Sequence, residues 1–338
     1  RGLGDVYKRQ DIESMEILKD PSSLAIFGVR GANGVIIITT KKAKEGQTLV
    51  NINTSFGFKK VVDKVKLVNG SQFRELYSEQ LANQEDAPFD FTGWNANTDW
   101  QDEIFQTAFI TNNNISITGA SPKHSFYLGV GYSYEQGNIE HEKFSKVTIN
   151  ASNDYKITDY LKVGFQFNGA RMLPADSKQV LNALRATPIA PVYNDEYGLY
   201  SALPEFQKAQ INNPMVDVSL RANTTKAENY RASGNIYGEV DFLKHFNFKA
   251  MFSMDYASNN GRTYQPIVKV YDPTVSGNIA TLGTGKTEVS QFKENETKVQ
   301  SDYVLTYTNS FDNGNHNLTA TAGFTTYYNS LSRLCLLY

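Results

Sequence analysis

The sequence contains three evenly spaced glycines beside an apolar run, and glycines with such spacing can form a phosphate-binding loop. The stretch DPSSLAIFGVRGANGVIIITTKK, residues 20–42, places them at Gly28, Gly31 and Gly34. A phosphate-binding loop needs a strand, then glycines, then a helix whose N-terminal N–H groups face the anion. Here Asp20 and Pro21 predict a short helix that ends at Gly28, and a β-branched strand pattern follows at 35–40. Because this order is reversed, the sequence disfavours a nucleotide site.

No other residues form a recognisable catalytic or metal-binding set. The four histidines fall in predicted turns or loops without ligand spacing: His124, His141, His245 and His316. The carboxylates Asp195 and Glu196 lie in a long predicted loop, where a solvated surface is the simplest explanation. No Gly-x-Ser-x-Gly elbow occurs. The sequence therefore predicts no enzyme activity, no metal site and no cofactor.

Composition excludes several classes of protein. The 338 residues carry a net charge of −2 without a basic stripe, so a nucleic-acid partner is not expected. The single cysteine, Cys335, excludes an internal disulfide and a multi-cysteine metal site. No run of about 18 apolar residues predicts a transmembrane helix. This absence does not exclude a transmembrane β-barrel, because the apolar residues of its strands recur at every second position.

Period-two alternation is the dominant pattern from about residue 48 onward. In residues 160–169 the apolar side chains Leu161, Val163, Phe165 and Phe167 alternate with polar residues and glycine. This alternation predicts strands with one apolar and one polar face. We predict nine such strands, at about 48–58, 112–119, 126–134, 143–154, 160–169, 225–241, 246–256, 297–310 and 315–329.

The connections between these strands alternate in length. Every second connection is a tight turn, read as SPK, KITD, LKH and DNGN, and the others are longer. Strands of an up-and-down sheet alternate in direction, so the tight turns fall at one end and the long loops at the other. Outer-membrane barrels sort their loops in this way, with short periplasmic turns and long extracellular loops. Tyrosines near predicted strand ends, such as Tyr132 and Tyr155, fit interfacial girdles. A large soluble β core is the alternative.

Residues 11–42, DIESMEILKDPSSLAIFGVRGANGVIIITTKK, resemble the C-terminal part of the plug domain of TonB-dependent outer-membrane transporters, in particular the SusC/RagA type of Bacteroidota. Phe27, Gly31 and Pro21 depart from the usual pattern of that motif. The segments 98–139, 212–219 and 235–256 are also similar to that family. The similarity covers about residues 11–330.

The resemblance implies a mainly β fold, with the C-terminal part of an α+β plug followed by part of an antiparallel transmembrane β-barrel. Residues 11–46 correspond to the plug and 47–332 to the N-terminal part of a barrel of about 22 strands. Residues 1–10 and 333–338 lack the pattern of their neighbours, and we predict that both are non-native.

The resemblance also implies a function. The family imports large nutrients, oligosaccharides or peptides, across the outer membrane. It takes energy from the TonB complex through an N-terminal segment that we expect to be missing here. A SusD-like lipoprotein covers the extracellular mouth. Two alternatives stay open, a passive porin or adhesin-type barrel and a soluble β-rich binding domain.

Site residues follow from the plug motif and from the loops. By analogy with the family, a structural and gating role is expected for Asp20, Gly28, Arg30, Gly31, Asn33 and Gly34. Arg30 is expected to pair with a carboxylate or carbonyls of the barrel wall. Loop aromatics that could contact a glycan or peptide are Trp94, Tyr193, Tyr197 and Tyr200, although loop packing is the favoured role for each, because long loops need small cores of their own. Trp100 is expected to be structural.

Overall fold

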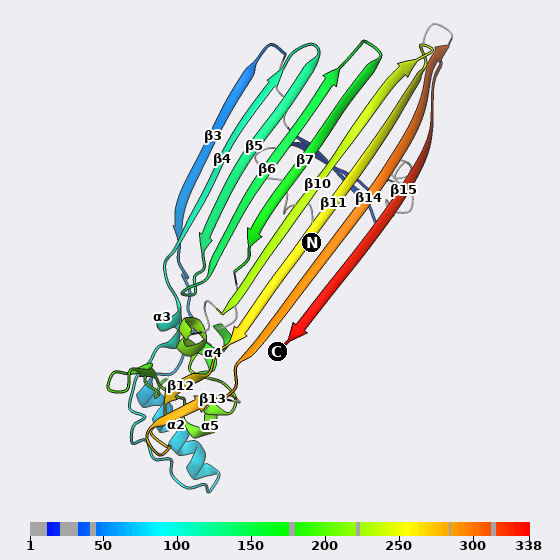
Figure 1. Cartoon of the computed structure of the whole chain (residues 1–338). Coiled ribbons are helices and arrows are strands. Elements are labelled where there is room, and N and C mark those ends of the chain that lie inside the picture. Colours follow the sequence, from blue (N-terminus) through cyan, green and yellow to red (C-terminus); the bar gives the residue numbers. More distant parts are fainter. Residues whose placement is uncertain are drawn as a thin grey trace.

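A nine-stranded antiparallel sheet dominates the computed structural model of the chain (Figure 1). The structure describes residues 12–20, 33–40, 45–175, 180–220, 224–283, 285–311 and 316–338. The helix predicted after Asp20, together with Gly28, Arg30 and Gly31, lies outside the described residues. The sheet strands are β3 (Thr48–Lys59), β4 (Ala108–Ala120), β5 (His124–Gln136), β6 (Lys143–Lys156), β7 (Leu161–Leu173), β10 (Thr225–Phe242), β11 (Phe246–Gln265), β14 (Glu288–Phe311) and β15 (His316–Leu337).

Each strand of the sheet pairs with its neighbours in sequence order, from β3 to β15. The prediction of nine strands in a meander is therefore confirmed, but several strands are longer than predicted. β11 continues from residue 256 to Gln265, and β14 begins at Glu288 instead of 297. The few apolar side chains in these extensions, such as Val289 and Phe292, do not alternate with polar ones, so no sequence pattern could detect them. β15 likewise stays paired with β14 through Leu337, across the residues predicted to be non-native.

The unbroken register gives the sheet one apolar and one polar face. In β7, β10 and β11, for example, Phe165, Ile236 and Phe252 are cross-strand neighbours. Following these pairings, the apolar face carries Ile52, Ile115, Val130, Ile149, Phe167, Ile236, Phe252, Tyr303 and Phe324. With strands about 4.8 Å apart, this face is about 40 Å wide. It is too extensive for the surface of an ordinary soluble monomer.

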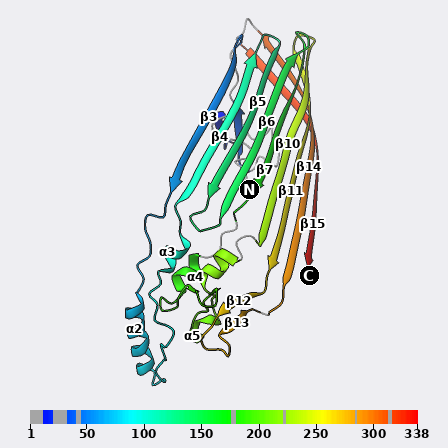
Figure 2. The same cartoon turned by 60° about the vertical axis from the view of Figure 1, so that its left-hand side comes forward.

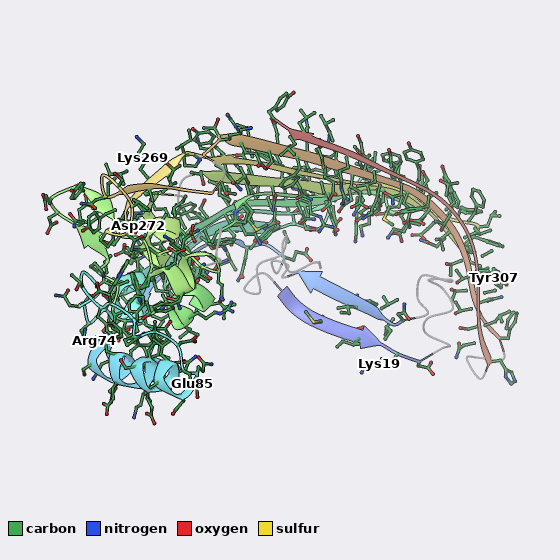
Figure 3. All side chains as sticks on the ribbon, turned by 90° about the horizontal axis from the view of Figure 1, so that it is seen from below. Lys19, Arg74, Glu85, Lys269, Asp272 and Tyr307 are labelled. Atoms are coloured by element: carbon green, nitrogen blue, oxygen red, sulfur yellow. The ribbon has the colours of Figure 1, made fainter. Side chains whose placement is uncertain are left out.

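The sheet is curved, and its polar face lies on the concave side. Side chains on a concave surface crowd together, and Asn150 is only 8 % exposed although its sequence neighbour Ile149 is 43 % exposed. The two-stranded sheet of β1 (Ile12–Leu18) and β2 (Val35–Thr40) lies within this curve, with Lys19 just beyond β1 (Figure 3). The strand predicted at 35–40 is confirmed as β2.

All long connections lie at one end of the sheet, as predicted, and short hairpin turns lie at the other (Figures 1 and 2). The long connections contain α2 (Gly70–Asn83), α3 (Trp100–Ile104), α4 (Val180–Arg185), β8 (Tyr193–Asn194), β9 (Leu199–Tyr200), α5 (Glu205–Lys208), the π-helical turn η4 (Val216–Leu220), β12 (Val268–Tyr271) and β13 (Ile279–Leu282). In the described part of the chain, no helix is long and apolar enough to cross a membrane.

We call the described parts of 60–107, 174–224 and 266–287 the loop module. Its core is a cluster of buried side chains from different loops, including Trp94, Ile104, Ile189, Leu203 and Met215. A smaller cluster joins Ala202 and Val216 to Val268 and Val270 of β12. The long loops therefore fold together into a packed unit at one end of the sheet.

Candidate functional site

The polar face of the sheet carries most of the charged side chains of the strands. Tyr237 of β10 lies on this face towards the hairpin-turn end of its strand and donates a hydrogen bond to the Asp154 carboxylate of β6. The ammonium groups of Lys249 and Lys162 lie 4.7 and 5.5 Å from the centroid of its ring. A wall of this kind suits a water-filled lumen, since its charged groups interact with one another and with solvent.

Hydrogen bonds between loops hold the loop module together. The Trp100 indole N–H donates to the Thr187 carbonyl oxygen over 2.9 Å, which joins the first long loop to the second. The Asn213 amide donates to the carbonyl oxygens of Val192 and Ser201, over 2.9 and 2.8 Å. Because these side chains are buried, the bonds fix the loops more firmly than exposed bonds would.

A cavity of about 270 Å³ lies between the second long loop and the β12–β13 hairpin. Aliphatic side chains line part of it, among them Leu203, Ile211 and Val270. The polar part contains the Lys208 ammonium, which lies 3.2 Å from a carboxylate oxygen of Asp272. A cavity of this size is just below the usual range for small-molecule sites, about 300–1,000 Å³.

Asp272 is held ionised although its side chain is only 2 % exposed. Burial alone would raise the pKa of this carboxyl group, because it disfavours the charged form. Hydrogen bonds from the hydroxyl and the backbone N–H of Thr274, together with Lys208, outweigh burial and lower the pKa. The pKa of Lys208 is raised, chiefly by its hydrogen bond to Glu205, and Asp272 adds to this effect.

The described residues contain no group of three or more His, Cys, Asp or Glu side chains that could hold a metal ion. Two of the histidines pack as ordinary structural residues. The ring of His124 lies 5.5 Å from that of Phe126, and a ring nitrogen of His245 lies 3.1 Å from the Thr308 carbonyl oxygen.

Comparison with known proteins places the chain in a family. No protein-family model matches it. TonB-dependent receptor P3 of Formosa agariphila is 32 % identical over 330 residues, which is 93 % of this chain and 30 % of that protein. TonB-dependent receptor SusC of Bacteroides thetaiotaomicron is 36 % identical over 192 residues, 55 % of this chain and 19 % of SusC. The chain belongs to the SusC/RagA-type TonB-dependent receptors.

The fold of this receptor chain agrees with that assignment. A structure of the RagAB peptide importer in its open-open state superposes with a TM-score of 0.74 at 19 % identity, covering 98 % of this chain and 40 % of that one. The nine-stranded sheet is thus similar to part of the RagA barrel. The receptor chain spans about 30 % of the length of the first curated relative. TonB-dependent receptors are outer-membrane proteins, and the relatives found are receptors and importers.

The plug residues of the receptor chain are only partly described. Asp20 follows β1, and Asn33 lies in the exposed turn before β2. Gly34 has a φ of +95°, in the region that favours glycine, and a Cβ there would lie 3.3 Å from the Leu18 carbonyl oxygen. A side chain at this position would therefore strain the β1–β2 connection. Gly28, Arg30 and Gly31 lie outside the described residues.

The loop aromatics predicted from the receptor sequence do not share one environment. Trp94 is 2 % exposed and lies in the core of the loop module, which favours packing over ligand contact. Tyr193 is 44 % exposed, and its ring lies 5.2 Å from that of Tyr200. Tyr197 accepts a hydrogen bond from the Asn278 amide over 2.9 Å, which joins it to the β12–β13 hairpin. Trp100 is buried, consistent with the structural role expected for it.

Sequence reasoning missed the polar residues of the cavity. Lys208 ends the short helix α5, whereas Asn213 and Asp272 lie in irregular segments, and Lys208 is 64 positions from Asp272. No motif or periodicity links them. Only the packing of the long loops brings them together.

Proposed function

We propose that the receptor chain is part of an outer-membrane importer of large nutrients, oligosaccharides or peptides. The observation that carries the proposal is the sheet itself, with an apolar face about 40 Å wide and a charged concave face. The apolar face would contact lipid and the polar face would line a lumen. The similarity to TonB-dependent receptors over 93 % of the chain supports this arrangement.

In this proposal, the β1–β2 pair belongs to a plug within the lumen. A plugged barrel conducts nothing large until the plug is rearranged, so import requires energy from outside the barrel. The TonB complex would supply it by pulling on a segment N-terminal to the plug. Asp20, Asn33 and Gly34, with Gly28, Arg30 and Gly31, would shape the part of the plug that moves.

The loop module would form part of the extracellular mouth. A SusD-like lipoprotein would cover this mouth, as the pairing in the RagAB importer suggests. The exposed Tyr193 and its neighbours Tyr197 and Tyr200 would then contact glycan or peptide as it enters. Trp94 would contribute by packing, since it is buried.

Uptake in the native host tests the proposal. Cells that carry the whole receptor would be given fluorescently labelled oligosaccharides and, separately, labelled peptides. We expect uptake of one class to require the receptor and to stop when TonB is deleted or a protonophore is added. Uptake that continues without TonB would contradict the proposal and would favour a passive porin.

A further inference from the structure

The apolar face of the sheet carries charge at one level only. In the described strands of the nine-stranded sheet, the charged residues on this face are Lys143, Arg171, Lys226, Glu228, Arg262 and Lys293. All six lie near the long-loop ends of their strands. Five cations against one carboxylate make this level of the face strongly basic.

Two of these cations are directly opposed. Lys226 of β10 and Arg262 of β11 are cross-strand partners, which places their Cβ atoms about 5 Å apart on the same face. Like charges in this geometry destabilise a sheet. Neither side chain has an ion-pair partner among the described residues, whereas the nearby Arg171 is paired with Glu228. An anion bound between Lys226 and Arg262 would remove the repulsion.

Lys293 of β14 adds a third cation at the same level of the apolar face. It is the cross-strand partner of Asn260, and it lies diagonally across from Arg262, whose own β14 partner is the uncharged Gln291. Lys293 also has no ion-pair partner in the described part of the chain. Three exposed cations on adjacent strands therefore face the surroundings together.

A groove with a volume of about 410 Å³ lies on the same face, further from the long loops. Small residues of β10, Ala232 and Gly234, form its floor. Larger apolar side chains of β7 and β11 form its walls: Phe165, Phe167, Phe252, Met254 and Tyr256. The large side chains that line the groove belong to the apolar face.

We propose that this surface binds a phosphate-bearing lipid of the outer leaflet, with its phosphate at Lys226 and Arg262 and an acyl chain in the β10 groove. Lys226 is six residues from Ala232, or about 20 Å along a strand. An acyl chain can span this distance. Arginine and lysine are the usual ligands of phosphate, and arginine can bind it through two parallel hydrogen bonds. The inference rests on the membrane placement in the proposed function.

The occupant is a lipid because the two cations need an anion, whereas the groove needs an apolar chain. A free phosphate would leave the groove unfilled, and a neutral acyl chain would leave the two cations opposed. A lipid with a charged head and an apolar tail satisfies both. Since the long loops would be extracellular, the basic level lies where outer-leaflet head groups are, and phosphate-bearing glycolipids are abundant there.

Native mass spectrometry of the whole receptor in a non-ionic detergent tests the site. The probes are diphosphoryl lipid A, its dephosphorylated counterpart and inorganic phosphate. We expect the double variant Lys226→Gln, Arg262→Gln to bind diphosphoryl lipid A about 25-fold more weakly, or about fivefold for each cation. Ala232→Phe, which fills the groove, should also weaken binding of lipid A.

A matched control is available on the polar face. Lys156 of β6 and Lys162 of β7 are also opposed cross-strand cations, but Glu239 lies beside Lys162 on the next strand. Lys156→Gln, Lys162→Gln removes the same charge from the other face, and it should change lipid A affinity less than twofold. Heat-modifiable migration on gels would verify that each variant is folded.

Three results would overturn the proposal. The first is equal lipid A affinity in the wild type and the Lys226→Gln, Arg262→Gln variant. The second is equally tight binding of dephosphorylated lipid A, and the third is inorganic phosphate binding as tightly as lipid A. Because the assay uses no cargo and no TonB, its result is independent of whether the receptor imports nutrients.

Discussion

At the scale of single residues, Asp272 joins two separate parts of the loop module. Its carboxylate accepts hydrogen bonds from the Thr274 hydroxyl, over 2.6 Å, and from the Thr274 backbone N–H, over 2.9 Å. It also pairs with Lys208 from a different loop. One buried side chain thus fixes both the turn after β12 and the contact of the hairpin with α5.

Asp272→Ala should loosen the β12–β13 hairpin. The substitution leaves the Thr274 donors without their acceptor and removes one of the two carboxylates paired with Lys208, so we expect a loss of about 2 kcal/mol in the local free energy of opening. Hydrogen exchange of the hairpin amides in the whole receptor measures it. Glu205→Gln is the control, because Glu205 is 73 % exposed and its pair with Lys208 should contribute less than about 1 kcal/mol. Equal effects of the two substitutions would contradict this assignment.

Acid should loosen the β12–β13 hairpin as Asp272→Ala does. The pKa of Asp272 is lower in the folded protein than its ordinary value of 3.8. Its contribution is therefore complete above about pH 4 and is lost as the pH falls through the lowered folded pKa. Hydrogen exchange of 268–283 should accelerate only below about pH 4 after correction for the intrinsic rate. In Asp272→Asn this acid step should be absent.

At the scale of elements, the loop module depends on contacts between long loops. Trp100 is one of two buried tryptophans of this module, and its indole N–H donates to the Thr187 carbonyl oxygen of the second loop. Trp100→Phe should cost about 1 kcal/mol through the lost hydrogen bond, and Trp100→Ala about 3–5 kcal/mol through the cavity left behind. Limited proteolysis of the whole receptor should show faster cleavage in both 60–107 and 174–224. Cleavage confined to the first loop would show that the two loops are not coupled.

The two faces of the strands should differ in their tolerance of charge. Ile52 is 68 % exposed on the apolar face of β3, and its neighbour Asn53 is on the polar face. Ile52→Arg should destabilise the receptor by about 2–4 kcal/mol in lipid vesicles, since a cation in the hydrocarbon is costly. Asn53→Arg should cost less than about 1 kcal/mol. Urea unfolding in vesicles measures both, and equal losses would mean that the face of Ile52 is not in lipid.

The strands were also the part of the fold most open to prediction from sequence. Alternation such as Phe246, Phe248, Ala250 and Phe252 has a direct physical cause, because one face is apolar and the other polar. The loop module had no such signal. Its core residues, such as Trp94 and Ile189, come from separate loops, and their burial depends on long-range packing. The cavity pair Lys208 and Asp272 was unpredictable for the same reason.

At the scale of the whole molecule, the nine-stranded sheet has two unpaired edges, the outer sides of β3 and β15. Long strands with free N–H and C=O groups recruit other strands. The 338-residue chain alone in detergent should therefore associate, with most of the protein larger than a monomer by light scattering after gel filtration. The whole receptor should be free of such association if a closed barrel pairs both edges. A monodisperse, monomeric 338-residue chain would contradict this expectation.

The unbroken register of the sheet has a consequence for how the gene can change length. Loss or gain of one codon within a strand would move every later side chain of that strand to the opposite face. Ile149 would move to the polar face and Asn150 to the apolar face. Loss or gain of two codons would return later side chains of the strand to their original faces. The long loops could lose or gain any number of codons. An alignment of relatives should thus place odd-numbered insertions and deletions in 60–107, 174–224 and 266–287, and almost none between paired strand residues.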